Sequence, residues 1–129
     1  MPVVVDASAL VELLLQGGRA PAVAHAVGTS DLAAPDIVNP EVLSVLRRME
    51  RTGELRAARA GQAIDDLVDA PVRRFPTLPL LPVVWELRGS VSSYDACYVA
   101  LARALGCPLV TGDLRLARAP GLGVPLVTV

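Results

Sequence analysis

The sequence contains no lysine, and all twelve of its basic residues are arginine. The formal net charge is −1, so no overall positive field draws nucleic acid to the molecule. Arginine offers a planar guanidinium that suits phosphate groups, whereas lysine is a point charge. A GC-rich genome, whose codons favour arginine and alanine, explains the same composition, and we give that explanation more weight.

Long hydrophobic runs are also missing, although 53% of the residues are hydrophobic and the mean hydropathy is +0.50. Asp6 and Glu12 interrupt the apolar N-terminal stretch, and nothing approaches the roughly 20 apolar residues of a spanning helix. No basic segment precedes a long apolar one, as a signal peptide requires. We therefore expect a cytoplasmic protein with no membrane segment, whose apolar excess covers a subunit or partner interface.

Cysteine and histidine are scarce, with two residues and one residue, respectively. Cys97 and Cys107 match no zinc or redox spacing and are expected to be reduced core residues. His25 has no paired ligand, which favours a surface position. Since no histidine lies in a suitable pattern with Ser8 or the other serines, a serine hydrolase is improbable.

Short apolar segments alternate with helical patterns along the 129 residues, a length that suits one domain. The expected strands are 3–5, 31–34, 72–75, 109–110 and 126–129. The expected helices are 8–15, with Ser8 as N-cap, 20–27, 41–51, 55–68, 83–88 and 93–105. Such alternation predicts an α/β fold with a parallel sheet covered on both faces.

Four acidic residues occupy special places in this pattern. Asp6 and Asp113 follow apolar strands, while Glu41 and Asp95 lie in the first turns of helices. In open parallel sheets the site lies outside the carboxyl ends of the strands, where these side chains can converge. Each acid alone is explained by a cap or a helix-dipole contact, and Asp113 also suits a cap for a short helix at 114–118. Their combination favours a functional site.

Clustered carboxylates without a cationic partner indicate a divalent metal. Mg²⁺ and Mn²⁺ prefer oxygen ligands, and without metal the crowded charges raise at least one pKa. A bound metal polarises a phosphate oxygen and lowers the pKa of bound water, which points to phosphodiester hydrolysis. Ser8 and Thr111 are placed to orient a carboxylate or a water. The acids at 65, 66 and 69 fit a solvated helix face. Tyr94 and Tyr98 flank Asp95, and contact with a base and core packing explain them equally well.

Four segments of the chain resemble the PIN-domain ribonucleases, and their order and spacing are most similar to the VapC toxins of bacterial toxin–antitoxin pairs. These segments are Val-Val-Val-Asp-Ala-Ser-Ala-Leu at 3–10, Pro-Glu-Val at 40–42, Tyr-Asp-Ala-Cys-Tyr-Val-Ala-Leu-Ala at 94–102 and Leu-Val-Thr-Gly-Asp at 109–113. Each motif alone is weak, whereas the last two together are fairly specific. The resemblance covers essentially the whole chain.

The resemblance implies a PIN domain over 1–129, with a three-layer α/β/α fold and a central five-stranded parallel sheet. It also implies endoribonuclease activity dependent on Mg²⁺ or Mn²⁺, a homodimer, and an inhibitory antitoxin that forms a heterotetramer or larger assembly. The family's acidic residues map to Asp6, Glu41, Asp95 and Asp113. Some members carry a further acid after the last one, where this chain has Leu114, so the number of metal ions stays open.

The sequence leaves several interpretations to compare. Arg115 and Arg118 are candidates for RNA phosphate contacts, and surface salt bridges explain them equally well. A phospho-accepting response-regulator domain also carries acids at strand ends, but it uses a lysine that this chain lacks. A catalytically silent PIN-like binding module and a PIN ribonuclease that is not a toxin remain alternatives. Single-stranded RNA loops are the expected substrates of a nuclease.

Overall fold

Five parallel strands form the centre of the protein, which we describe from a computed structural model of residues 1–129. The strands are β1 (Pro2–Val5), β2 (Asp31–Pro35), β3 (Val72–Phe75), β4 (Leu109–Thr111) and β5 (Leu126–Thr128). They pair in the order β3-β2-β1-β4-β5, and every pairing is parallel. The five-stranded parallel sheet predicted from the sequence is therefore confirmed.

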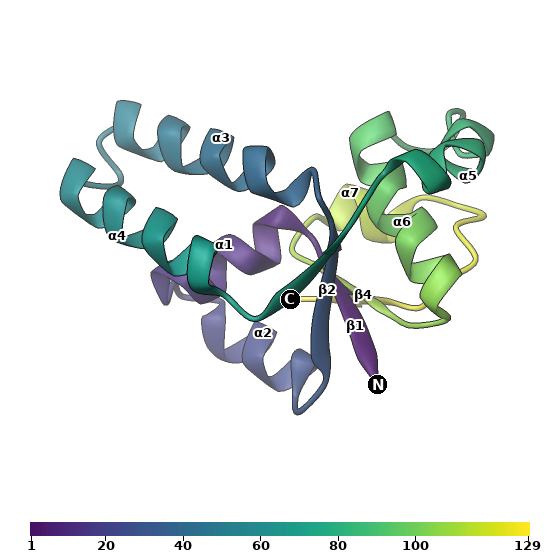
Figure 1. Ribbon diagram of the computed structural model, residues 1–129, viewed down its shortest axis with the longest axis horizontal. Coiled ribbons are helices and arrows are strands. Elements are labelled where there is room, and N and C mark those ends of the chain that lie inside the picture. The colour runs from purple at the N-terminus through teal and green to yellow at the C-terminus, as the bar shows by residue number, and fades with distance from the viewer.

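Seven α-helices and one short 3-10 helix connect the strands. They are α1 (Ala7–Leu15), α2 (Ala20–Val27), α3 (Val38–Arg51), α4 (Ala57–Asp69), η1 (Leu78–Leu80), α5 (Leu81–Glu86), α6 (Ser93–Leu105) and α7 (Leu114–Arg118). In Figure 1, α1 to α4 lie on one side of the sheet and α5 to α7 on the other. This arrangement is the predicted three-layer α/β/α fold.

Strand β1 is buried on both faces, because helices cover both sides of the sheet. Val3 and Val5 pack with Ala9 of α1 and Val23 of α2 in a small cluster. Val4 points to the opposite side and belongs to the main core, which includes most of α6. The continuous apolar run of β1 follows from this double burial, which is typical of parallel sheets.

The order of the strands reverses next to β1. The chain moves outward from β1 to β2 and β3, and then returns to place β4 and β5 on the other side of β1. In open α/β sheets, ligands bind outside the carboxyl ends of the strands at this switch point. Response-regulator domains have the order 2-1-3-4-5 and so differ in topology. Asp6, directly after β1, and Asp113, two residues after β4, therefore share the edge where a site is expected.

Two predicted helix starts are wrong by a few residues. The N-cap of α1 is Asp6 rather than Ser8, because the Asp6 side chain accepts a hydrogen bond from the backbone N–H of Ala9. Helix α3 begins at Val38, three residues before the predicted start at Glu41. Pro40 is tolerated in its first turn, where backbone N–H groups have no partner within the helix. Glu41 still lies in that first turn.

The helix predicted for 83–88 also starts earlier than expected, within a stretch rich in proline, 76–82. This stretch forms η1 and the start of α5, so the predicted helix begins at Leu81. Pro79 and Pro82 occupy early positions of these two helices, where proline needs no hydrogen-bond partner. Elsewhere, Cys97 and Cys107 are buried free thiols and His25 is exposed, as predicted. No helix has the length and apolarity that a membrane crossing requires.

Candidate active site

Asp6 is the most buried acidic residue of the site, with 7% of its surface exposed. Its Oδ1 atom accepts hydrogen bonds from the Ser8 hydroxyl at 2.6 Å and from the Ala9 N–H at 2.9 Å. Its Oδ2 atom accepts a short hydrogen bond from the Thr111 hydroxyl. Asp6 therefore caps α1 and at the same time links the ends of β1 and β4.

The direction of these hydrogen bonds is fixed by the backbone after β4. The Gly112 N–H donates to the Ser8 hydroxyl at 3.0 Å, and the Asp113 N–H donates to the Thr111 hydroxyl at 2.9 Å. A hydroxyl has only one hydrogen, so each of these hydroxyls is left to donate toward Asp6. The two hydroxyls thus favour the ionised form of the Asp6 carboxylate. Ser8 and Thr111 orient Asp6, one of the two roles that the sequence suggested.

Glu41 is held in place by a residue from the other side of the sheet. The Tyr98 hydroxyl on α6 donates to Glu41 Oε1 on α3 at 2.5 Å. Tyr98 is 1% exposed, so it is a core residue whose hydroxyl reaches the site. Burial, followed by the hydrogen bond to Glu41, raises the pKa of the Tyr98 hydroxyl, which stays a donor. The second oxygen of Glu41 accepts no hydrogen bond from the protein.

Asp95 and Asp113 line a common cleft of about 250 Å³ at the start of α6 and α7. Asp113 is the N-cap of α7, because its Oδ1 atom accepts from the N–H groups of Arg115 and Leu116. The structural role that the sequence suggested for Asp113 is thus present, and its other oxygen stays free. Asp95 is half-buried in the first turn of α6, whose N-cap is Ser92.

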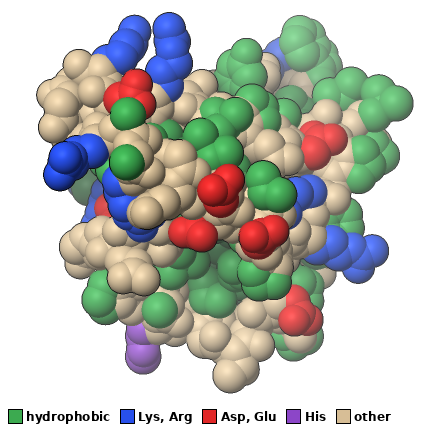
Figure 2. Space-filling model, turned by 60° about the vertical axis from the view of Figure 1, so that its left-hand side comes forward, with side chains coloured by type: hydrophobic (Ala, Val, Ile, Leu, Met, Phe, Trp, Pro, Cys, Tyr) green, Lys and Arg blue, Asp and Glu red, His purple; other side chains and the backbone are tan.

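The four carboxylates influence one another electrostatically. Burial raises the pKa of Asp6, and the Asp113 charge adds to that effect. Burial also raises the pKa of Glu41, with further contributions from the charges of Asp95 and Asp6. The pKa of Asp95 is raised by burial and then by the charges of Asp113 and Asp6. Figure 2 shows acidic side chains near the middle of one face, with basic side chains toward its margins. The acids from four elements therefore form one interacting group.

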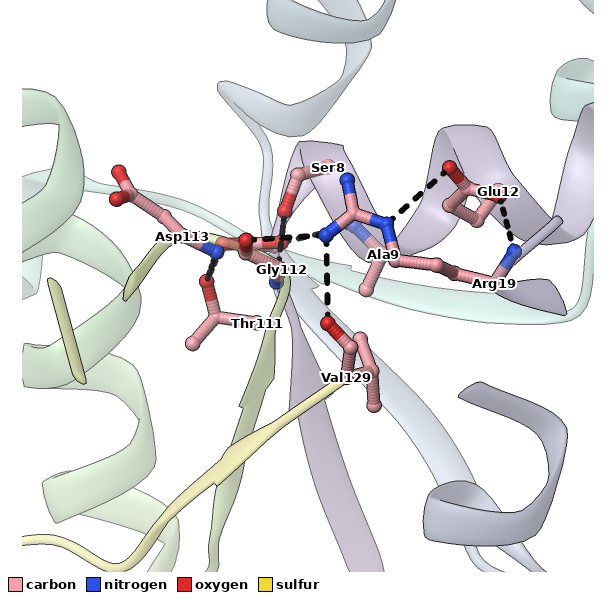
Figure 3. Close-up of polar contacts among 9 residues, drawn as sticks. Ser8, Ala9, Glu12, Arg19, Thr111, Gly112, Asp113 and Val129 are labelled. Carbon is pink, nitrogen blue, oxygen red and sulfur yellow. Dashed lines mark hydrogen bonds and ion pairs between the residues drawn. The ribbon is translucent and has the colours of Figure 1, made fainter. Parts of the chain in front are cut away.

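Arginines approach this group from two sides. Arg19, just before α2, donates to the carbonyl oxygens of Gly112 and Val129, each at 3.3 Å, and its Nε atom lies 3.6 Å from Glu12 Oε1 (Figure 3). It ties the turn after β4 to the end of β5, and no sequence motif indicated this role. Arg115 lies 3.8 Å from Asp113, but its side chain is 93% exposed.

The salt bridge considered for Arg115 therefore exists, although exposed ion pairs contribute little to stability. The positive charge of Arg115 also offsets a small part of the rise in the pKa of Asp95. Arg118 is exposed at the last position of α7. Binding of RNA phosphates by these two arginines stays a prediction.

The donor atoms of the site suit a hard divalent cation, because they are carboxylate and hydroxyl oxygens with no thiol or imidazole among them. Burial and the charges of neighbouring acids raise the pKa of Asp6, Glu41 and Asp95, as in a metal site without its metal. In the present side-chain conformations, however, no three His, Cys, Asp or Glu side chains are close enough together to hold a metal ion. Coordination by three or four of the acids would therefore require side-chain rotation.

The sequence of the chain is similar to those of known proteins. Residues 3–122 match the PIN domain family. The chain is 39% identical over 127 residues to VapC ribonuclease Mb0985 of Mycobacterium bovis, with 98% of each chain covered. It belongs to the PIN-domain family. The curated relatives of this PIN domain include VapC ribonucleases, as the sequence motifs suggested.

Solved structures share the fold of this PIN domain. PAE2754 from Pyrobaculum aerophilum superimposes with a TM-score of 0.70 at 28% identity, covering 98% of this chain and 84% of that one. VapBC2 from Rickettsia felis, solved with a DNA fragment from its promoter, gives a TM-score of 0.69 at 14% identity, covering 99% and 98%. At 14% identity, the similarity to VapBC2 shows only a shared fold.

The PIN-domain structure brings together the four acids named from the sequence, together with Ser8 and Thr111. Tyr98 was recognised in the sequence only as a core residue or a base contact, and its link to Glu41 was missed. The available signal was its position one helical turn after Tyr94 and three residues after Asp95, which places its hydroxyl near the same end of α6. Nothing in the sequence indicated the role of Arg19, apart from its position after Gly17 and Gly18.

Proposed function

We propose that this PIN domain is a metal-dependent endoribonuclease and the toxin of a VapBC-type toxin–antitoxin pair. It hydrolyses a phosphodiester bond of RNA at Asp6, Glu41, Asp95 and Asp113. The observation that carries the proposal is the gathering of these four carboxylates at the switch point of the sheet, three of them with raised pKa. Curated relatives that are named ribonucleases support the same activity.

Each residue has a defined task in this proposal. Asp6, Asp95 and Asp113 hold Mg²⁺ or Mn²⁺, with Glu41 as a direct or water-mediated fourth ligand. A divalent ion held by these residues would act as a Lewis acid that polarises a phosphate oxygen and lowers the pKa of a bound water. Ser8 and Thr111 favour the ionised form of Asp6 and fix its direction. Where Glu41 is a water-mediated ligand, its free oxygen would accept a proton from the attacking water. Arg115 neutralises the RNA phosphate.

The catalytic proposal is tested by RNA cleavage with purified protein free of any antitoxin. We expect cleavage of a structured RNA with Mg²⁺ or Mn²⁺ and none in EDTA. Asp95→Asn keeps the side-chain shape and should abolish cleavage while leaving the fold intact. Asp65→Asn, on the exposed face of α4, is the matched control and should cut like the parent. Undiminished cutting by Asp95→Asn would exclude the proposed site, and parent protein that cuts no RNA would favour a silent binding module.

The antitoxin is proposed as a partner on the grounds of charge and family. An arginine or lysine from an antitoxin segment beside the four carboxylates would compete with the metal for them. Such competition inhibits the enzyme without a conformational change.

The exposed apolar side chains are of the kind that a partner usually covers, and a symmetric homodimer is the commonest way to cover one apolar patch. They include Leu78, Leu81 and Trp85 around α5.

A further inference from the structure

Tyr94 is an exposed aromatic residue next to the acidic group, in a chain with only 3% aromatic residues. Its surface is 65% exposed, whereas Tyr98, one helical turn further along α6, is 1% exposed. The sequence suggested either core packing or a base contact for both tyrosines. The structure separates the two, since Tyr98 is in the core and Tyr94 faces solvent beside Asp95.

The Tyr94 ring forms one wall of a cleft of about 300 Å³. The other lining residues are Ile37, Pro40, Glu41 and Ser44. Because Glu41 belongs to the candidate active site, this cleft lies beside that site. The cleft that holds Asp95, Asp113 and Arg115 is lined by different residues. The first turn of α6 contributes Tyr94 to one cleft and Asp95 to the other.

The two clefts differ in chemistry. Arg115 lies in the cleft of Asp95 and Asp113, and the proposed metal would offset the charge of these two carboxylates, so this cleft suits a phosphate group. No arginine lines the Tyr94 cleft, and Glu41 would repel a phosphate there. Its walls are an aromatic ring, a proline and an isoleucine, with the Ser44 hydroxyl as a neutral hydrogen-bonding group. Such walls favour a flat, uncharged and partly apolar group, as a nucleobase is.

We propose that a base next to the cleaved phosphate of a single-stranded RNA stacks on the Tyr94 ring in this cleft. The proposal rests on the proposed ribonuclease function and adds a base-binding subsite to it. The phosphate lies on the Asp95 side of the first turn of α6, and the neighbouring base lies on the Tyr94 side. Stacking on a π-face accepts every base, so the subsite contributes affinity more than sequence preference.

The test is RNA binding in the Asp95→Asn background, where the RNA stays intact. The probe is a fluorescently labelled single-stranded RNA that spans a site cut by the parent protein. A second probe has abasic riboses in place of the bases that flank this site. Tyr94→Ala should weaken binding of the first probe about tenfold, as the loss of one stacked base does. It should leave binding of the abasic probe nearly unchanged.

Two variants serve as controls. Tyr94→Phe keeps the ring and should bind the intact probe like the background protein. Gln62→Ala changes an exposed, uncharged residue of α4 that lines neither cleft, and it should also leave binding unchanged. If the parent cuts RNA but Tyr94→Ala binds both probes like Gln62→Ala, the subsite is wrong and the ribonuclease function stands. If the parent cuts no RNA, both fail together.

Discussion

Side-chain hydroxyls fix the direction of two of the four carboxylates at the candidate site. Asp6 receives the hydroxyls of Ser8 and Thr111, while Glu41 receives that of Tyr98. Preorganised groups need little rearrangement during reaction, so the residues that orient them affect rate more than binding. Tyr98 offers the clearest test, because its ring is buried and does not contact the solvent that carries the substrate.

Tyr98→Phe should lower kcat for RNA cleavage about tenfold, with KM nearly unchanged, because it frees the orientation of Glu41 without altering the surface. In a Glu41→Gln background the same substitution should have little further effect, since residues that act as a unit are not additive. Steady-state kinetics of the four proteins measure both quantities. A raised KM with unchanged kcat would show that Tyr98 does not act through Glu41.

The raised pKa of Asp95 predicts that the stability of the protein depends on pH. Burial and neighbouring acids raise this pKa in the folded protein, so the folded state keeps a proton that the unfolded state loses. Stability of the metal-free protein therefore falls as pH rises from the unfolded pKa to the folded one. In EDTA at pH 7, Asp95→Asn should melt at a higher temperature than the parent, and the difference should shrink toward about pH 4. A lower melting temperature at pH 7 would contradict this account.

At the scale of elements, the ends of β1 and β4 are joined by side chains as well as by the sheet. Thr111 is fully buried, donates to Asp6 and accepts from the Asp113 N–H. It connects the N-caps of α1 and α7, which are Asp6 and Asp113. The helix capping that explains each acid separately is therefore also what positions them for a common site.

Thr111→Val should reduce the free energy of unfolding by about 1–3 kcal/mol, because buried groups on Asp6 and Asp113 lose their partner. Thr128→Val is the matched control. Thr128 is the residue opposite Thr111 in the β4–β5 register, but it is exposed. Its substitution should change stability by no more than about 0.5 kcal/mol. Chemical denaturation measures both, and equal effects would show that the hydroxyl of Thr111 is not special.

Much of this arrangement could be predicted from the sequence, for reasons of periodicity. The boundaries of α2, α6 and β3 agree with the prediction, because apolar patterns and the glycine stops after α2 and α6 define them. The start of α3 was missed because Asn39 and Pro40 read as a loop, whereas a first turn tolerates both. The link from Tyr98 to Glu41 joins residues 57 positions apart, and no local pattern reports such a contact.

At the scale of the whole molecule, the apolar surface predicts association. Trp85, Leu78 and Val68 are among the large hydrophobic side chains that remain more than half exposed in the single chain. We expect a symmetric homodimer at micromolar concentration, because such surfaces are usually covered in solution. Light scattering after size-exclusion chromatography measures the mass directly. A monomer under these conditions would contradict the expectation.

The toxin role is tested in cells. Expression of this chain alone should arrest bacterial growth, and coexpression of the antitoxin encoded beside it should restore growth. Asp95→Asn should be harmless at the same level of expression, because it removes a proposed metal ligand. If the parent chain is harmless when well expressed, the toxin assignment is wrong, although a ribonuclease that is not a toxin would still be possible.

The central claim is that the four carboxylates form one metal site, and a metal titration followed by thermal unfolding tests it most directly. Ligands that bind only the folded state raise the melting temperature, and Mn²⁺ also offsets the repulsion among the acids. Asp113→Asn removes one charge and keeps an oxygen that can cap α7. We predict a clear rise with millimolar Mn²⁺ in the parent and in Asp65→Asn, and a smaller rise in Asp113→Asn. An equal rise in all three proteins would place the metal elsewhere and contradict the account.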